Sequence, residues 1–187
     1  MTLTAPVDQQ LMLAVRDGEV EKLGVLFDRH HRALYNFFLR LTRERSAAED
    51  LVQEVFIRVL KYRHTYRGDS QFLTWAYQIA RRAHIDWLRK KKPEAQWDDE
   101  RPEPASHEPA VSERLREGQE QELLKTAFAR LPDDRQEILV LTRYQEMEYG
   151  EVAKVLGCNV GAVKTRVHRA TRDLAEIFFR LQKVRKT

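Results

Sequence analysis

The sequence has few of the residues that build disulfide-bonded or membrane-spanning proteins. Its 187 residues include one cysteine, Cys158, which excludes an internal disulfide framework and is typical of a reducing compartment. No stretch approaches the ~18 to 20 apolar residues that a membrane-spanning helix needs. Residues 1–15 lack the basic region, long apolar core and small-residue cleavage site of a secretory signal. We therefore expect a cytoplasmic chain without membrane insertion.

Signatures of catalysis are also scarce. The 7 glycines form no phosphate-binding loop, and no histidine pair is spaced along one helix face with an acid to hold a catalytic metal. His30 and His31 are adjacent, so we expect ordinary surface and core roles for them. The acidic run 98–100 is more typical of a solvated linker than of a cation site. The sequence therefore predicts no cofactor, no metal site, no catalytic residue and no small-molecule substrate.

Charge is distributed unevenly along the chain. Residues 1–92 carry 17 basic and 11 acidic side chains, whereas residues 93–118 carry 3 basic and 8 acidic side chains and four of the 6 prolines. Residues 119–187 are basic again, with 13 basic and 10 acidic side chains. A proline-rich acidic segment cannot build a packed core, so we expect two small basic domains joined by an acidic flexible linker. Basic domains suit a polyanionic partner, although a solvated surface explains this modest excess nearly as well.

Apolar residues recur at three- and four-residue steps almost throughout the chain, which predicts an all-α protein. Before the linker we expect four helices, at about 8–17, 23–41, 46–62 and 72–92. Asp8 is expected to cap the first of these, and Ser46 and Glu49 to form a capping box at the start of the third. After the linker we expect a helix that ends before Pro132, another over 133–144, and one on each side of Gly157.

The strongest local motif lies between residues 148 and 177. Residues 149–156 predict a short helix, Gly157 a turn, and Val160 the start of a longer helix, which is the helix-turn-helix pattern. The longer helix has an apolar face and an opposite face made of Gly161, Lys164, Thr165, His168, Arg169 and Arg172. Small N-terminal residues followed by hydroxyl, imidazole and guanidinium groups are typical of a helix that reads DNA. We favour DNA binding over the alternative, a solvated basic face on a helical hairpin.

One apolar residue stands on the polar face of the helix over 46–62. Ile57 lies there among Asp50, Gln53 and Glu54, opposite the continuous apolar side. Docking onto a partner helix would explain it, but single exposed apolar residues are common in proteins. From the residues alone, both explanations stand.

The helix over 72–92 carries an aromatic residue beside a basic stripe. Trp75 lies at the edge of its apolar side, next to Gln78, Arg82 and Arg89. Rings that stack on bases beside guanidinium groups that pair with phosphates are typical of single-strand binding. Core tryptophans next to a row of arginines that extend to solvent explain the pattern equally well.

These segments resemble the extracytoplasmic-function (ECF) group of bacterial sigma factors, in the sigma-70 family. Residues 50–60, 72–81 and 85–89 are similar to the first conserved domain of that family, and residues 131–135 and 160–170 to the second. The resemblance covers most of the chain outside the linker and the extreme ends. It implies a sigma region 2-like domain over 1–92, an acidic linker over 93–118, and a region 4-like helix-turn-helix domain over 119–187.

The resemblance also implies partners for each surface. RNA polymerase core enzyme would bind the face that carries Asp50, Gln53, Glu54 and Ile57. Promoter DNA at the minus-ten element would be captured and melted by the loop over 66–72 and the helix after it, through Tyr66, Arg67, Phe72, Trp75, Gln78, Arg82 and Arg89. The helix from Val160 would bind the minus-thirty-five element. Two positions depart from the family: Arg82, where asparagine is frequent, and Ala76, where leucine is common.

The implied function is that of an alternative sigma factor, which directs core enzyme to specific promoters, promotes melting and catalyses no reaction itself. An anti-sigma factor is the further partner that the resemblance implies. A free-standing helix-turn-helix regulator that binds a palindrome as a dimer is the alternative from another class. A basic, aromatic-edged first domain and an acidic linker argue against it, and a helical enzyme, the third alternative, lacks any motif.

Overall fold

The computed structural model describes residues 7–91 and 113–185, and every regular element within these two stretches is a helix. The all-α prediction is therefore confirmed. An N-terminal domain is formed by α1 (Asp8–Arg16), α2 (Lys22–Thr42), α3 (Arg45–Tyr62), the short 3-10 turn η1 (Arg63–Thr65) and α4 (Phe72–Lys91). A C-terminal domain is formed by α5 (Glu113–Ala129), α6 (Asp133–Leu139), the π-helical turn η3 (Val140–Tyr144), α7 (Tyr149–Leu156) and α8 (Val160–Arg185).

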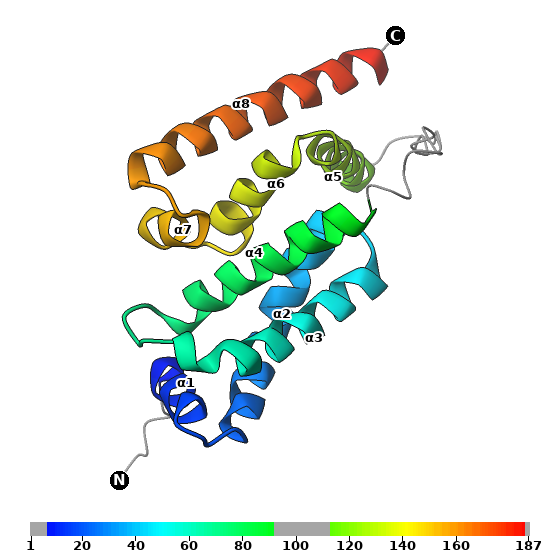
Figure 1. Ribbon diagram of the computed structural model, residues 1–187. Coiled ribbons are helices and arrows are strands. Elements are labelled where there is room, and N and C mark those ends of the chain that lie inside the picture. The colour runs from blue at the N-terminus through cyan, green and yellow to red at the C-terminus, as the bar shows by residue number, and fades with distance from the viewer. Residues whose placement is uncertain (1–6, 92–112, 186–187) are drawn as a thin grey trace.

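The N-terminal domain is built on the packing of α2 against α3, with α4 across α3 and α1 at one end (Figure 1). Apolar residues at three- and four-residue spacing on each helix meet in its interior, and the largest fully buried side chains include Leu34, Phe37, Phe38, Val55, Phe72 and Tyr77. Burial of each such side chain contributes roughly 1.5–3 kcal/mol to stability. This core fixes the directions in which α3 and α4 present their outer faces.

Two helix starts differ from the sequence prediction. The N-cap of α1 is Val7, and Asp8 lies in the first turn with its carboxylate bound to α2 instead. The predicted capping box is also wrong, because α3 begins at Arg45 with Glu44 at the N-cap and no side-chain cap bond. The chain leaves α2 through Arg43 in the left-handed conformation. The α3 helix then begins at Arg45, one residue before Ser46, which was expected to be its N-cap.

In the C-terminal domain, α5 begins at Glu113, inside the stretch 93–118 that was predicted to be a linker. The last proline of that stretch is Pro109, and the residues after Ser112 are mostly Glu, Arg and Leu, which favour helices. The first described helix after the predicted linker therefore begins before residue 119. Residues 93–112, the rest of the predicted linker, lie outside the described residues.

The two domains pack directly on each other. In Figure 1, α4 lies between the α2–α3 pair and the α6–α7 side of the C-terminal domain, while α8 runs along the far side. The largest of these contacts joins α4 to α7, and smaller ones join α2 to α6 and to η3. Within the described ranges, no helix has the length and apolarity that crossing a membrane requires.

Candidate polymerase and nucleic-acid interfaces

The helix-turn-helix forms as the sequence predicts. Gly157 ends α7 in the left-handed conformation, with φ of 63°, which glycine adopts without steric cost. Asn159 then caps α8: its Oδ1 accepts a hydrogen bond from the backbone N–H of Ala162 at 2.8 Å. This is the Asn N-cap that satisfies one of the free amides of a helix start. The turn and the cap together set the direction in which α8 leaves α7.

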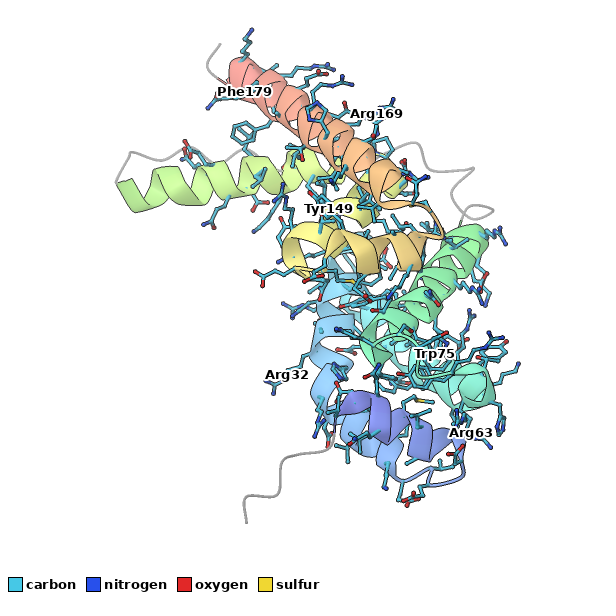
Figure 2. The ribbon with its side chains drawn as sticks, turned by 90° about the vertical axis from the view of Figure 1, so that its left-hand side faces the viewer. Arg32, Arg63, Trp75, Tyr149, Arg169 and Phe179 are labelled. Atoms are coloured by element: carbon cyan, nitrogen blue, oxygen red, sulfur yellow. The ribbon has the colours of Figure 1, made fainter. Side chains whose placement is uncertain are left out.

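The two faces of α8 separate as expected. Val163, Val167 and Ala170 are buried, whereas the opposite face is exposed at all six predicted DNA contacts: Gly161, Lys164, Thr165, His168, Arg169 and Arg172. In Figure 2, Arg169 lies on the outer helix far from Trp75. We name this exposed surface the α8 face.

Ion pairs fix one end of the α8 face. The Arg172 Nε lies 3.6 Å from Glu176 Oε1, and Arg135 of α6 forms an ion pair with Asp173. Asp173 and Glu176 thus hold the Arg172 guanidinium along the helix. Arg169 lies one turn nearer the N-terminal end and is exposed.

On α3, the residue that stood out in the sequence is exposed. Ile57 has 61% of its surface accessible, and Asp50 and Gln53 on the same face are exposed as well. Glu54 is half-buried, and its Oε1 accepts a hydrogen bond from Arg58 Nε at 2.6 Å. Arg58 in turn reaches Asp86 of α4 at 2.9 Å. We name the surface of Asp50, Gln53, Glu54 and Ile57 the α3 face; its apolar centre is ringed by polar groups, one of them held in place.

The predicted minus-ten residues divide into two groups. Arg67, Arg82 and Arg89 are exposed, whereas Tyr66 and Phe72 are each only 1% exposed. Trp75 is half-buried, with its ring centroid 5.2 Å from that of Tyr66 and 6.5 Å from that of Phe72. In this arrangement Tyr66 and Phe72 shape the wall beside Trp75, and they offer no free ring on which a base could stack.

The loop over 66–72 has a defined conformation. Gly68 has a φ of 75°, and the hydroxyl of Tyr66 donates a hydrogen bond to the carbonyl oxygen of Ser70 at 2.9 Å. Burial, with smaller effects from Asp69 and Asp8, raises the pKa of Tyr66 to about 12. Tyr66 therefore stays a neutral hydrogen-bond donor, and its buried ring lies beneath the loop.

One predicted contact residue, Gln78, is engaged by the other domain. Its Nε2 donates a hydrogen bond to the backbone oxygen of Lys154 on α7 at 3.0 Å. Around it, Thr74 donates to Glu151, and the hydroxyl of Tyr77 donates to Gln145 Oε1 at 2.6 Å. These positions lie on one stripe of α4, at steps of three and four residues. We name the stripe of Thr74, Tyr77, Gln78 and Arg81 the docking stripe.

The docking stripe ends in a half-buried ion pair. Arg81 Nε lies 3.1 Å from Glu137 Oε2 on α6, and the side chain of Glu137 is only 10% exposed. Burial raises the pKa of Glu137, and its contacts with Arg81 offset only part of that effect. Since a buried carboxylate is costly without a partner, Arg81 ties the two domains together at this point.

Arg40 of α2 and Arg43, the residue that follows α2, add further contacts between the domains. The guanidinium carbon of Arg40 lies 3.5 Å from the centre of the Tyr144 ring, a cation–π contact. Arg43 Nη2 donates to the carbonyl oxygen of Ala129 and to Gln136 Oε1, each at 3.0 Å. Together with the docking stripe, these contacts hold the chain in one closed arrangement.

Sequence reasoning missed the residues that join the domains. Tyr77, Arg81, Glu137 and Gln145 meet only through contacts between residues 56 or more positions apart, which local periodicity does not report. A weak signal was present, since Gln136 and Glu137 stand directly before the apolar run 138–141. Asn159 could have been assigned as an N-cap from residue type and position alone. Among the described residues, no group of three or more His, Cys, Asp or Glu is placed to hold a metal ion.

Comparisons with known proteins agree with this organisation. The family model for sigma-70 region 2 matches residues 26–94, and the model for sigma-70 region 4 matches residues 121–174. The RNA polymerase sigma factor YlaC of Bacillus subtilis is 32% identical over 80% of this chain and 87% of its own length. The ECF RNA polymerase sigma factor SigX of the same organism is 31% identical over 82% of this chain and 82% of its own length.

A solved structure shares the fold over most of its length. The sigma factor RpoE of Bartonella quintana, solved in complex with the anti-sigma factor NepR, is 27% identical to this chain with a TM-score of 0.64. The match covers 82% of this chain and 94% of the RpoE chain. With region 2 and region 4 present in order and relatives matched over 82–94% of their own length, the chain belongs to the sigma-70 family of RNA polymerase sigma factors, in its ECF group.

Proposed function

We propose that this chain is an alternative sigma factor that directs RNA polymerase core enzyme to a two-part promoter and helps to melt the DNA there. The observation that carries the proposal is the exposed α8 face on a capped helix-turn-helix, in the same chain as the exposed Ile57 on region 2. As a sigma factor it works in transcription initiation as a binding subunit without a reaction of its own. It acts in the cytoplasm, where bacterial RNA polymerase is found.

Core enzyme binds the α3 face. An exposed isoleucine inside a polar ring suits the centre of a protein interface, where an apolar residue is desolvated and the surrounding polar groups exclude water. The hydrogen bond from Arg58 holds the Glu54 carboxylate beside Ile57, so less side-chain freedom is lost when the partner docks.

The α8 face binds the minus-thirty-five element. Arg169 and His168 reach base edges in the major groove, and Lys164 and Arg172 pair with phosphates. Gly161 and Ala162 have small side chains at the start of α8, so the free backbone amides there approach the DNA backbone closely. All of these groups are available in the closed arrangement.

The minus-ten element is bound by the loop over 66–72 and by α4, and this step requires the domains to separate. Gln78 cannot both donate to Lys154 and contact DNA with the same amide hydrogen. The stripe that holds Trp75, Gln78, Arg82 and Arg89 lies directly beside the docking stripe and shares Gln78 with it. Undocking of α7 therefore frees Gln78 and clears one side of the basic stripe for a melted strand.

An anti-sigma factor is the partner that regulates this chain. The structural relative from Bartonella quintana was solved with such a partner, and here the domains already pack so that one bound protein can span both of them. An inhibitor that favours the closed arrangement over the open one keeps the docking stripe occupied.

Reconstitution with core enzyme tests the proposal. The full chain is mixed with core RNA polymerase from the same bacterium and sheared genomic DNA, and the 5′ ends of the transcripts are sequenced. We expect a set of start sites that is absent with core alone and that shares two upstream elements. Start sites indistinguishable from those of core alone, with the chain folded and bound to core, would overturn the proposal.

A further inference from the structure

We infer that α1 is a brace for the base-binding loop, and that Gln9 is a positioning residue for capture of the minus-ten strand. The inference rests on the proposed function, because it assigns α1 a role in the same DNA-binding step. In Figure 1, α1 lies at the end of the N-terminal domain where η1 leads into α4. Residues 66–71, which connect η1 to α4, make up all of the loop over 66–72 except Phe72, so α1 lies against the segment that would hold the base.

Two side chains of α1 hold the backbone of the loop. The Gln9 Nε2 donates to the carbonyl oxygen of Ser70 at 3.2 Å and lies 3.5 Å from that of Gly68. Arg16 Nη1 lies 3.4 Å from the carbonyl oxygen of Tyr66. The carbonyl of Ser70 also accepts the hydroxyl of Tyr66. Three carbonyl oxygens of the loop, those of Tyr66, Gly68 and Ser70, therefore face donors from α1 or from the Tyr66 side chain.

Packing adds to the hydrogen bonds. A Cβ on Gly68 would lie 3.3 Å from Leu13 Cδ2, so Leu13 of α1 fills the space that glycine leaves at the tip of the loop. The positive φ of Gly68 already disfavours any other residue there. Glycine at this position thus serves both the turn and its close contact with α1.

The brace is itself anchored to α2. Asp8 Oδ1 accepts a hydrogen bond from Arg29 Nη1 at 2.7 Å, and Asp8 Oδ2 lies 2.6 Å from His30 Nε2. Partial burial opposes ionisation of Asp8, but the bonds from Arg29 and His30 outweigh it and hold the pKa below its usual value. Asp8 therefore stays charged at neutral pH and fixes the start of α1, one residue before Gln9.

A braced loop binds a strand more tightly than a mobile one. Ordering a loop at the moment of binding costs conformational entropy, and contacts that order it beforehand remove that cost from the binding step. Gln9 touches no DNA in this account. It acts through the Gly68 and Ser70 carbonyls, which set the positions of the exposed Arg67 and of Asp69 at the tip.

The chain offers a matched pair of variants. Gln9→Glu keeps the size of the side chain but removes the N–H donors, because a carboxylate only accepts hydrogen bonds. Gln10→Glu adds the same charge to the adjacent position of α1, where Gln10 is exposed. Gln9→Ala and Gln10→Ala repeat the comparison without added charge, and circular dichroism checks that each variant keeps its helicity.

Two measurements are made on the full chain. The first is hydrogen exchange of amides 66–71 in the free protein. The second is binding of the reconstituted holoenzyme to a single-stranded oligonucleotide, the non-template minus-ten segment of a promoter mapped by start-site sequencing. Loss of the Gln9 bonds should speed exchange of the loop and weaken strand binding, each by about 10-fold, since one or two hydrogen bonds are lost. The Gln10 variants should match wild type, and affinity for core enzyme should not change.

The outcomes separate the two proposals. If the Gln9 variants behave like the Gln10 variants in strand binding, whether or not loop exchange changes, the positioning role of Gln9 is overturned while the proposed function stands. If the wild-type holoenzyme itself fails to distinguish this oligonucleotide from a scrambled one, the proposed role of the loop is overturned, and the role of Gln9 in strand capture with it.

Discussion

The two DNA-binding regions of this sigma factor stand in different states within one closed chain. The α8 face is exposed at each of its six predicted contacts, whereas the minus-ten region has Tyr66 and Phe72 buried and Gln78 bound to the other domain. Under the proposed function, the first surface meets duplex DNA as it stands, whereas Gln78 of the second is free for DNA only after α7 leaves α4.

The difference follows from how each surface is built. A recognition helix presents its outer face by local geometry, since a turn, a cap and the 3.6-residue period decide which side chains point outward. The minus-ten surface depends on packing between segments far apart in the sequence: α1 against the loop, and α6 and α7 against α4. Packing between the domains can therefore also cover part of such a surface, as it covers Gln78 here.

The largest expected effect is on the affinity of the α3 face for core enzyme, which involves neither of the two DNA-binding surfaces. Ile57→Asp places a charge at the centre of the proposed interface, where it would be desolvated without a partner. Affinity for core enzyme should fall by about 30-fold or more, corresponding to ~2 kcal/mol or above. Titration of labelled core measures it.

Val184→Asp serves as the control, because Val184 is an apolar residue 74% exposed at the far end of α8. It should leave core affinity unchanged. Equal affinity of the Ile57→Asp chain and wild type for core, at normal helicity, would remove the α3 face from this account.

The next effect distinguishes base reading from phosphate pairing on the α8 face. Arg169→Ala should cost ~1 to 3 kcal/mol on the best minus-thirty-five sequence and relax the preference at one base pair. Lys164→Ala should weaken all sequences alike and reduce the slope of log affinity against log salt by about one unit. Both variants are tested on a panel of single-base changes at several salt concentrations. A uniform loss across that panel for Arg169→Ala would make Arg169 a phosphate contact.

A smaller effect is expected on the equilibrium between the closed and open arrangements of the two domains, which the ion pair between Arg81 and Glu137 favours in its closed form. Arg81→Ala removes the partner of the buried Glu137 and should shift the chain toward the open arrangement by ~1 kcal/mol, about 5-fold in population. Small-angle X-ray scattering of the free chain reports this as a larger radius of gyration.

Arg82→Ala is the matched control, since Arg82 is the adjacent arginine and is exposed. It should leave the radius unchanged. An Arg81→Ala chain as compact as the Arg82→Ala chain would mean that the ion pair does not hold the domains together.

The smallest effect is a pH dependence in the N-terminal domain. Burial lowers the pKa of His84 below 6.5, and Asp133 offsets only part of that; the unfolded chain therefore takes up this proton at a higher pH than the folded one. The stability that His84 contributes is present above pH 6.5 and is lost as the pH falls through its lower folded-state pKa.

Urea unfolding at a pH of about 7.5 and of about 5.5 measures this loss. His84→Leu should reduce the fall in stability between the two, whereas His64→Leu, at an exposed histidine, should not. An equal fall in the two variants would show that the pKa of His84 does not differ between the folded and unfolded chains.

Much of the fold could be predicted from the sequence. The helix pattern, the helix-turn-helix, the outward residues of α8 and the exposure of Ile57 all follow from periodicity within single helices, and the structure agrees with them. The missed features depend on distant partners. Asp8 binds α2 instead of capping α1, and Gln78 of α4 donates to the backbone of Lys154, 76 positions away. Neither outcome can be read from neighbours in the sequence.

Separation of the domains during initiation is tested most directly by fluorescence energy transfer within the chain. Labels are attached to Arg32→Cys on α2 and Arg180→Cys on α8, two exposed positions, in a Cys158→Ser background. We predict one short-distance population in the free chain and a longer distance in holoenzyme bound to a melted promoter. An unchanged distance in a holoenzyme that opens DNA would contradict the account, because Gln78 would then remain against α7 while the strands part.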